Sequence, residues 1–169
     1  MYFDNFPIIS YKKKDVTNLL RRVAIRSKAK TNTLIFDTYD VKEGETPEMI
    51  ADKLYDDVEL HWVVLIVNNI VDRYHEWPMF GNQFLDYVNE KYSNPSATHH
   101  YEIAQSSGDT SVKINIGTDN TDYPTATAIT NFEFEQTDQD NKRKIRLLDP
   151  RFIDDFVSEF KDLMKESII

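Results

Sequence analysis

Residues 36–47 read Phe-Asp-Thr-Tyr-Asp-Val-Lys-Glu-Gly-Glu-Thr-Pro and carry three local signals in direct succession. The aromatic and β-branched residues within 34–41 favour a strand. Gly44 lies in a polar turn. Thr46 is a favourable helix N-cap, and Pro47 fits the first helical position because an N–H there would have no partner within the helix. The stretch therefore predicts a strand, a turn and the start of a helix.

Two helices are expected after this turn. In the first, Ile50 and Leu54 lie four residues apart and share one face. The second begins at about residue 59 and is apolar on two flanks, which predicts burial on both; these apolar residues are Leu60, Trp62, Val63, Val64, Leu65, Ile66 and Val67. This β-branched run also allows a strand. Asn68-Asn69-Ile70 ends the element, so residues 36–72 are expected to form a strand–helix–helix unit.

The preceding segment, residues 1–35, is expected to hold a strand and a basic helix. Residues 8–11 look extended, and Asp15 is placed to cap a helix with apolar residues at helical spacing, namely Val16, Leu19, Leu20 and Val23. Arg21, Arg22 and Arg26 make this segment basic within an acidic chain. They indicate either a solvated helix face or a patch that docks on an acidic partner.

Residues 73–169 are expected to add an aromatic loop, short strands and a final helix, or to join the rest in one continuous domain. A short helix is expected near 84–92. Extended segments are expected at 100–104, 112–116, 132–134 and 145–148, with polar turns or loops at 117–125 and 135–144. The chain as a whole therefore predicts an α+β fold.

The final helix has the clearest pattern. Asp149 is expected to cap it and Pro150 to take its first position. Its apolar stripe consists of Phe152, Ile153, Phe156, Val157, Phe160, Leu163 and Met164. Such a stripe must be covered, either by the chain's own sheet or by a partner helix.

Composition excludes several classes of function. The 169 residues include 20 Lys and Arg against 29 Asp and Glu, and a net charge of −9 disfavours general nucleic-acid binding. There is no cysteine for a disulfide or a thiolate site, and the four glycines form no phosphate-binding loop. The longest apolar run, residues 62–67, is too short to span a membrane, and the first residues do not look like a secretory signal.

No catalytic or metal-binding constellation is predicted. His99, His100 and Glu102 are close in sequence, but neighbours in a strand point to opposite faces and would not converge on an ion. Asp154 and Asp155 suit the first turn of a helix, where carboxylates are favourable. We therefore expect no cofactor and no enzymatic activity.

Residues 36–71 resemble a LysM module. The resemblance is carried by the strand and Gly44 turn, by the helix that Thr46 begins, and by the close at Asn68 and Asn69. These four residues are the expected turn and cap of a LysM-like unit. Glu43 and Glu45 crowd the turn at which a sugar would bind, so glycan binding is disfavoured.

The whole chain resembles the small LysM-like baseplate wedge proteins of contractile-tailed, T-even-type bacteriophages. The stretches that carry this resemblance stand in order along nearly the full length, at residues 1–3, 6–7, 17–26, 39–46, 68–70, 72–79, 99–102 and 145–151. The resemblance implies a structural subunit of the virion tail baseplate, assembled in the host cytoplasm. The implied partners are neighbouring wedges and other wedge and hub-proximal tail proteins, which the subunit joins around the tail hub; no nucleic acid, membrane span or cofactor is implied.

Contacts with those partners are expected from the basic segment, the aromatic loop and the final helix. The residues are Arg21, Arg22, Arg26, Tyr74, Trp77, Met79, Phe80, Phe156 and Phe160. Tyr, Trp and Arg are enriched where protein interfaces derive most of their binding energy.

Two other functions stay open from the residues. A LysM-type module that binds carbohydrate such as peptidoglycan would use Gly44, Thr46, Asn68, Asn69 and Ile70. A wall-degrading hydrolase would need two carboxylates across a cleft, such as Glu102 and a loop acid.

Overall fold

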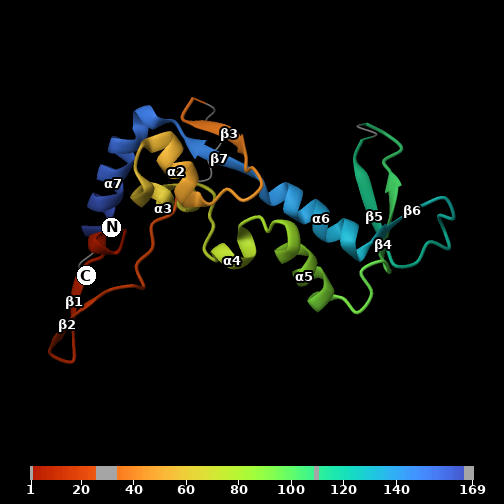
Figure 1. Cartoon of the computed structure of the whole chain (residues 1–169), viewed down its shortest axis with the longest axis horizontal. Coiled ribbons are helices and arrows are strands. Elements are labelled where there is room, and N and C mark those ends of the chain that lie inside the picture. The colour runs from red at the N-terminus through yellow and green to blue at the C-terminus, as the bar shows by residue number, and fades with distance from the viewer. Residues whose placement is uncertain (1, 26–33, 109–110, 166–169) are drawn as a thin grey trace. The chain divides into compact units, whose positions relative to one another are not determined.

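The computed structural model describes residues 2–25, 34–108 and 111–165, which form two compact units of an α+β fold (Figure 1). Unit 1 comprises residues 1–77 and 143–169, and unit 2 comprises residues 78–142. These units differ from the segments 1–35, 36–72 and 73–169 expected from the sequence. The difference arises because the end of the chain returns to pair with the strand at residues 36–40, a long-range pairing that no local pattern reveals.

Unit 1 is built on a two-stranded antiparallel sheet and the helices that follow its first strand. Strand β3 (Phe36–Asp40) pairs with β7 (Lys144–Leu148). Helix α2 (Pro47–Tyr55), the 3-10 turn η2 (Val58–Leu60) and α3 (His61–Val67) follow β3, and a short helix α4 (Arg73–Glu76) ends this part of the chain. The expected strand–helix–helix order is confirmed, and the β-branched run is a helix rather than a strand.

The core of unit 1 gathers residues from both ends of the chain. Its buried members are Phe6, Phe36, Trp62, Val63, Val67, Leu148, Phe160 and Met164. The Trp62 ring lies 4.5 Å from the Phe160 ring, and Tyr2 of the 3-10 turn η1 (Tyr2–Asn5) stacks on Phe160 at 5.6 Å. Among the described residues, no helix combines the length and apolar character needed to cross a membrane.

The final helix packs within its own chain. Asp149 caps the 3-10 turn η3 (Pro150–Phe152) by accepting the backbone N–H of Arg151 at 2.9 Å, and α7 (Ile153–Lys165) continues from it. The cap and helix are therefore confirmed, although the first turn is 3-10. The buried Phe160 and Met164 belong to the core of unit 1, so this part of the apolar stripe is covered without a partner helix.

A hairpin stands where the sequence predicted a basic helix after Asp15. β1 (Ile8–Tyr11) confirms the extended segment, but it pairs antiparallel with a second strand, β2 (Lys14–Thr17). Lys12 and Lys13 connect the strands with φ angles of 51° and 63°. Left-handed values at both central residues are typical of a two-residue type I′ turn, whose twist matches that of the flanking strands.

The helical spacing from Val16 to Val23 was therefore misleading. The backbone groups of this segment are satisfied by cross-strand pairing, and the strand ends where the Asn18 N–H donates to the Pro7 carbonyl at 2.8 Å. The Asn18 side chain then accepts the N–H of Leu20 at 3.1 Å, a local turn that competes with helix formation.

Unit 2 combines two helices with a three-stranded antiparallel sheet. Helix α5 (Gly81–Lys91) confirms the expected helix. The sheet has the strand order β5 (Lys113–Gly117), β4 (Thr98–Ala104) and β6 (Thr127–Thr130), which confirms two of the expected strands and adds β6.

Helix α6 (Asn131–Lys142) corrects two expectations, the extended segment at 132–134 and the loop at 135–144. Its buried residues are Glu135 and Gln139, so the face that packs inward is polar and leaves no apolar period to detect. A signal was nevertheless present in the sequence. Thr130 accepts the N–H of Glu133 at 3.2 Å, and the Glu133 carboxylate accepts the N–H of Thr130 at 2.8 Å, which is a capping box.

Candidate protein-binding surface

The basic segment contributes one exposed arginine to the described surface. The Arg21 guanidinium donates to the carbonyl of Leu163, so it ties the segment to the last turns of α7. Arg22 is exposed. Arg26 lies outside the described residues. Of the two arginines that the structure describes, Arg22 presents its side chain to solvent and Arg21 serves the fold.

The aromatic loop is divided between the two units. In unit 1, Tyr74 on α4 is 81% exposed, whereas Trp77 is buried and its indole N–H donates to the Glu45 carbonyl at 3.0 Å. In unit 2, Met79 is buried, with its backbone N–H donating to the Gln139 side chain at 2.8 Å, and Phe80 is half-buried. Tyr74 is thus the member of this set with the most surface to offer a partner.

The final helix offers part of its apolar stripe. Phe160 is buried against Trp62, and Phe156 is half-buried beside the same ring at 6.2 Å. Leu163 on this helix is 38% exposed. Most of the stripe therefore stabilises unit 1, and its solvent-facing edge is limited.

The turn between β3 and α2, which the sequence predicted to be LysM-like, is held by hydrogen bonds among its own polar groups. Gly44 has a φ of 78°, a left-handed conformation that glycine adopts without strain. The Glu45 carboxylate accepts the Tyr39 hydroxyl at 2.8 Å and the Lys42 N–H at 2.9 Å. Burial acts to raise the pKa of Glu45, but these hydrogen bonds outweigh it and hold the pKa below its usual range. Thr46 caps α2 by accepting the N–H of Met49.

The pair of asparagines after α3 closes that helix and fastens it to the sheet. Asn69 adopts a φ of 58°, and the Ile70 N–H donates to the Leu65 carbonyl at 2.9 Å, as in a Schellman C-cap. The Asn68 amide group donates to the carbonyls of Val64 and Arg146 and accepts the Arg146 N–H, each at 2.8 Å. Asn68 thereby satisfies both backbone groups of one β7 residue, as a neighbouring strand would.

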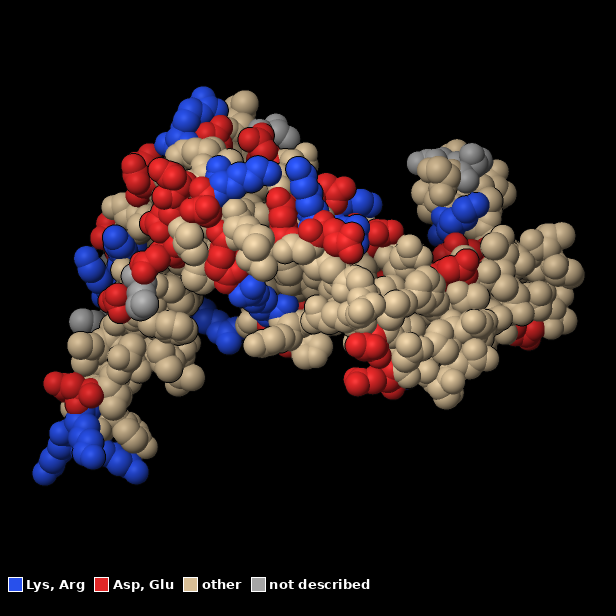
Figure 2. Space-filling view, in the orientation of Figure 1, with Lys and Arg blue, Asp and Glu red and all other residues tan. Residues whose placement is uncertain are grey.

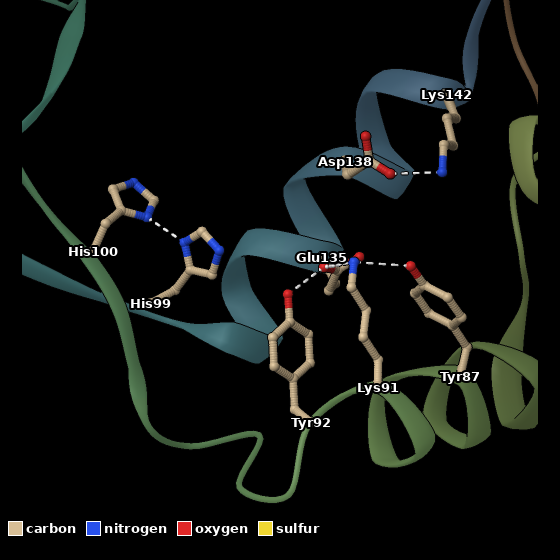
Figure 3. Close-up of polar contacts among 8 residues, drawn as sticks. All are labelled: Tyr87, Lys91, Tyr92, His99, His100, Glu135, Asp138 and Lys142. Carbon is tan, nitrogen blue, oxygen red and sulfur yellow. Dashed lines mark hydrogen bonds and ion pairs between the residues drawn. The ribbon is translucent and has the colours of Figure 1, made fainter. Parts of the chain in front are cut away.

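A polar cluster in unit 2 contains an acid, an amine and two phenols, a composition typical of a reactive site, but its hydrogen bonds hold two helices together (Figure 3). We call these four residues, Tyr87, Lys91, Tyr92 and Glu135, the clamp. The Glu135 side chain on α6 is only 2% exposed and accepts hydrogen bonds from the Lys91 ammonium and the Tyr92 hydroxyl, both at 2.7 Å. Lys91 also donates to the Tyr87 hydroxyl at 3.0 Å. These contacts join α6 to the end of α5.

The charges in this cluster stabilise each other. Burial acts to raise the pKa of Glu135, but the hydrogen bonds from Lys91 and Tyr92 outweigh it, and the pKa lies below its ordinary value. The hydrogen bond to Glu135 is the main reason that the pKa of Lys91 is raised. Both groups are therefore held in their charged forms, which suits an ion pair and not a proton donor or acceptor working near neutral pH.

The two histidines lie on the same side of β4, contrary to the expectation that they point apart. The pairing of β4 with β6 shifts register between Thr98 and His100, and this irregularity brings the Nδ1 atoms of His99 and His100 to 2.8 Å. His100 Nε2 lies 3.2 Å from the Glu102 carboxylate, and His99 stacks on Phe134 at 4.0 Å. Across residues 2–25, 34–108 and 111–165, no three acidic or histidine side chains gather as metal ligands.

Comparison with known proteins identifies the family. The family model described as base plate wedge protein 53, a phage family, matches residues 5–104. No curated protein matches the chain. The matched residues include the β1–β2 hairpin, the β3–α2–α3 unit and the His99–His100 strand. Because this match covers more than half of the chain, the chain belongs to the phage base plate wedge protein 53 family and is a structural protein of the virion tail baseplate.

Proposed function

We propose that the chain joins neighbouring wedges around the hub of a contractile tail through protein–protein contacts. The family match over residues 5–104 carries this proposal, since a wedge protein acts by binding other baseplate proteins. The side-chain clusters described above support it, because they hold elements of the chain together and leave the exposed aromatic and basic residues as its main binding groups.

Arg22 and Tyr74 are the predicted contact residues that this proposal relies on. Both lie in unit 1, and both are exposed. Because Tyr74 is 81% exposed, most of its side chain is still available, and its burial by a partner would contribute strongly to binding. Trp77, Met79 and Phe160 instead contribute indirectly, by fixing the shape of their units.

We infer that the LysM-like unit serves as a scaffold for these contacts. Its glycan-binding candidates Thr46 and Asn68 use their side chains to cap α2 and to fasten α3 to β7. The groups that a sugar would need are therefore engaged within the fold.

The test is complementation of a phage that lacks a functional copy of this gene. Arg22→Glu and Tyr74→Ala should each lower the yield of complete baseplates, measured by sedimentation, by about tenfold, as expected when a contact worth about 1.4 kcal/mol is lost. Matched controls are Lys113→Glu and Tyr123→Ala, both at exposed positions in unit 2. Wild-type yields for both unit 1 variants would remove these residues from the interface, and baseplates that assemble without the chain would overturn the proposed function.

A further inference from the structure

The β1–β2 hairpin presents an apolar face to solvent. Its register sets Ile9 opposite Val16 and Tyr11 opposite Lys14, and side chains two apart in a strand share a face. Ile9, Tyr11 and Val16 therefore lie together on one face with Lys14 at its tip end, and these three apolar residues are 39%, 60% and 39% exposed. The other face carries Ile8 with the polar Ser10, Asp15 and Thr17.

Two further exposed apolar residues follow the hairpin in sequence. Leu19 is 60% exposed and Leu20 is 91% exposed in the turn that follows β2. All eight strand residues of the hairpin are exposed, and an isolated two-stranded hairpin is only marginally stable in water. A contiguous apolar face on such an element is typical of a surface that another protein covers.

The tip of the hairpin adds charge of one sign. Lys12 and Lys13 occupy left-handed positions that Asn and Gly adopt most easily, and Lys14 follows directly. Figure 2 shows the blue side chains gathered at this tip. Lysine at these two left-handed positions is less favourable than Asn or Gly, which indicates that the side chains themselves have a use. With Lys14 they place three ammonium groups at the end of the hairpin.

We propose that this hairpin docks on an acidic surface of a different baseplate subunit, with Ile9, Tyr11 and Val16 against an apolar strip and Lys12–Lys14 reaching carboxylates at its end. The inference rests on the proposed function in that the partner belongs to the baseplate. Charge complementarity indicates the class of partner. The cationic tip fits a cluster of carboxylates, whereas the apolar face would make no favourable contact with the phosphate backbone of a nucleic acid, so a protein partner is favoured.

Zero-length carbodiimide cross-linking of purified baseplates tests the partner directly, because it joins an amine only to a carboxylate within ion-pair reach. Mass spectrometry should find Lys12, Lys13 or Lys14 joined to Asp or Glu of another subunit. Links to carboxylates of this same protein, and to no other subunit, would overturn the proposal. Hairpin lysines that an amine-modifying reagent labels as fully in baseplates as in the free chain would overturn it as well.

Two variants separate the charge from the apolar face. Lys12→Glu/Lys13→Glu/Lys14→Glu and Ile9→Ser/Val16→Ser should each reduce incorporation of the chain into baseplates by about tenfold, because both parts of the surface are buried in the contact. The matched control is Lys42→Glu/Lys113→Glu/Lys144→Glu, which changes three exposed lysines outside the hairpin. The near-ultraviolet circular dichroism of Trp62 and Trp77 reports whether unit 1 remains folded.

The outcomes distinguish this inference from the function on which it rests. If wild-type chain enters baseplates and both hairpin variants enter equally well, the hairpin proposal fails and the wedge function stands. If wild-type chain is absent from baseplates, the proposed function fails first.

Discussion

At the scale of single residues, two polar side chains join elements of the fold, the half-buried Asn68 and the buried Glu135. Asn68 joins the end of α3 to both backbone groups of Arg146 in β7. Glu135 joins α6 to Lys91 and Tyr92 at the end of α5. Each side chain provides contacts between elements that apolar packing would otherwise have to provide. Each also requires its hydrogen-bond partners to stay in place, because a buried polar group without a partner is costly.

Replacing Asn68 should destabilise unit 1 in a charge-dependent way. Asn68→Ala removes three hydrogen bonds and leaves the Arg146 N–H and carbonyl without that partner, so we expect a loss of about 2 kcal/mol in the free energy of unfolding. Asn68→Asp sets a carboxylate against the carbonyls of Val64 and Arg146 and should cost more at neutral pH than at acidic pH. Urea unfolding followed by tryptophan fluorescence measures both, and equal losses for Asp and Ala at neutral pH would contradict the assigned contacts.

Glu135 should make the stability of unit 2 depend on pH. Its pKa in the folded chain lies below the ordinary value of 4.5, so its contribution is fully present above pH 4.5 and is lost as the pH falls below that value through the folded pKa. Glu135→Gln should cost about 2 kcal/mol at neutral pH, and the difference from wild type should shrink in acid. Hydrogen exchange of α6 measures this.

The matched control for Glu135 lies on the same helix. Lys142→Met breaks the more exposed Asp138–Lys142 ion pair, which should cost less than about 0.5 kcal/mol. Tryptophan fluorescence should change for neither variant, since Trp62 and Trp77 both belong to unit 1. A loss for Lys142→Met as large as that for Glu135→Gln would show that burial of the carboxylate is not what gives the clamp its strength.

At the scale of elements, the sequence predicts those whose buried faces are apolar. α7 and the β3–α2–α3 segment have a cap, a regular period and large apolar residues, and each was placed correctly. α6 was missed because Glu135 and Gln139 form its buried residues, and the β1–β2 hairpin because Lys12 and Lys13 are not residues that signal a turn.

The same reasoning applies to the candidate site. The residue types of the site can be predicted, since arginine and aromatic residues are enriched at interfaces. Which of those side chains are exposed in the folded chain cannot be predicted in the same way. Trp77 and Tyr74 are only three residues apart in the same aromatic segment. Trp77 is nevertheless buried, with its indole N–H donating to the Glu45 carbonyl, whereas Tyr74 faces solvent. Burial of this kind depends on the long-range fold, which a local pattern does not contain.

The hairpin turn should respond to substitution in opposite ways for stability and assembly. Lys12→Asn/Lys13→Gly replaces two residues at left-handed φ values with the pair that suits a type I′ turn, and should stabilise the hairpin by about 1 kcal/mol. Amide hydrogen exchange at Ile9 and Val16 should slow in the free chain. Baseplate incorporation should nevertheless fall, because two of the three ammonium groups are gone; a rise in both would indicate that the turn serves only the hairpin's own structure.

At the scale of the whole molecule, one unit is inserted in the sequence of the other. Unit 2 is continuous, and unit 1 resumes at Arg143, whose carbonyl accepts the Val41 N–H at 2.9 Å. Trp77, the last residue before the insertion, is held to Glu45 in the same turn region of unit 1. Both ends of the insertion are therefore anchored by the β3–α2 connection.

Removing the insertion should leave unit 1 folded. Replacing residues 78–142 with a short Gly/Ser linker keeps the core of Phe36, Trp62, Leu148 and Phe160 intact, so we expect one cooperative thermal transition with the near-ultraviolet signal of both tryptophans preserved. The full-length chain is the control. A broad, non-cooperative transition and loss of the tryptophan signal would show that unit 1 needs unit 2 in order to fold.

The pairing of β3 with β7 has a consequence for how the protein is made. Phe36 must wait for Leu148, which is 148 − 36 = 112 residues later on the ribosome, whereas unit 2 has its whole sequence available before that strand emerges. Unit 2 can therefore fold during translation, and unit 1 closes last. A prematurely terminated chain would lack β7 and α7, and with them Leu148, Phe160 and Met164, so it could not complete the core of unit 1.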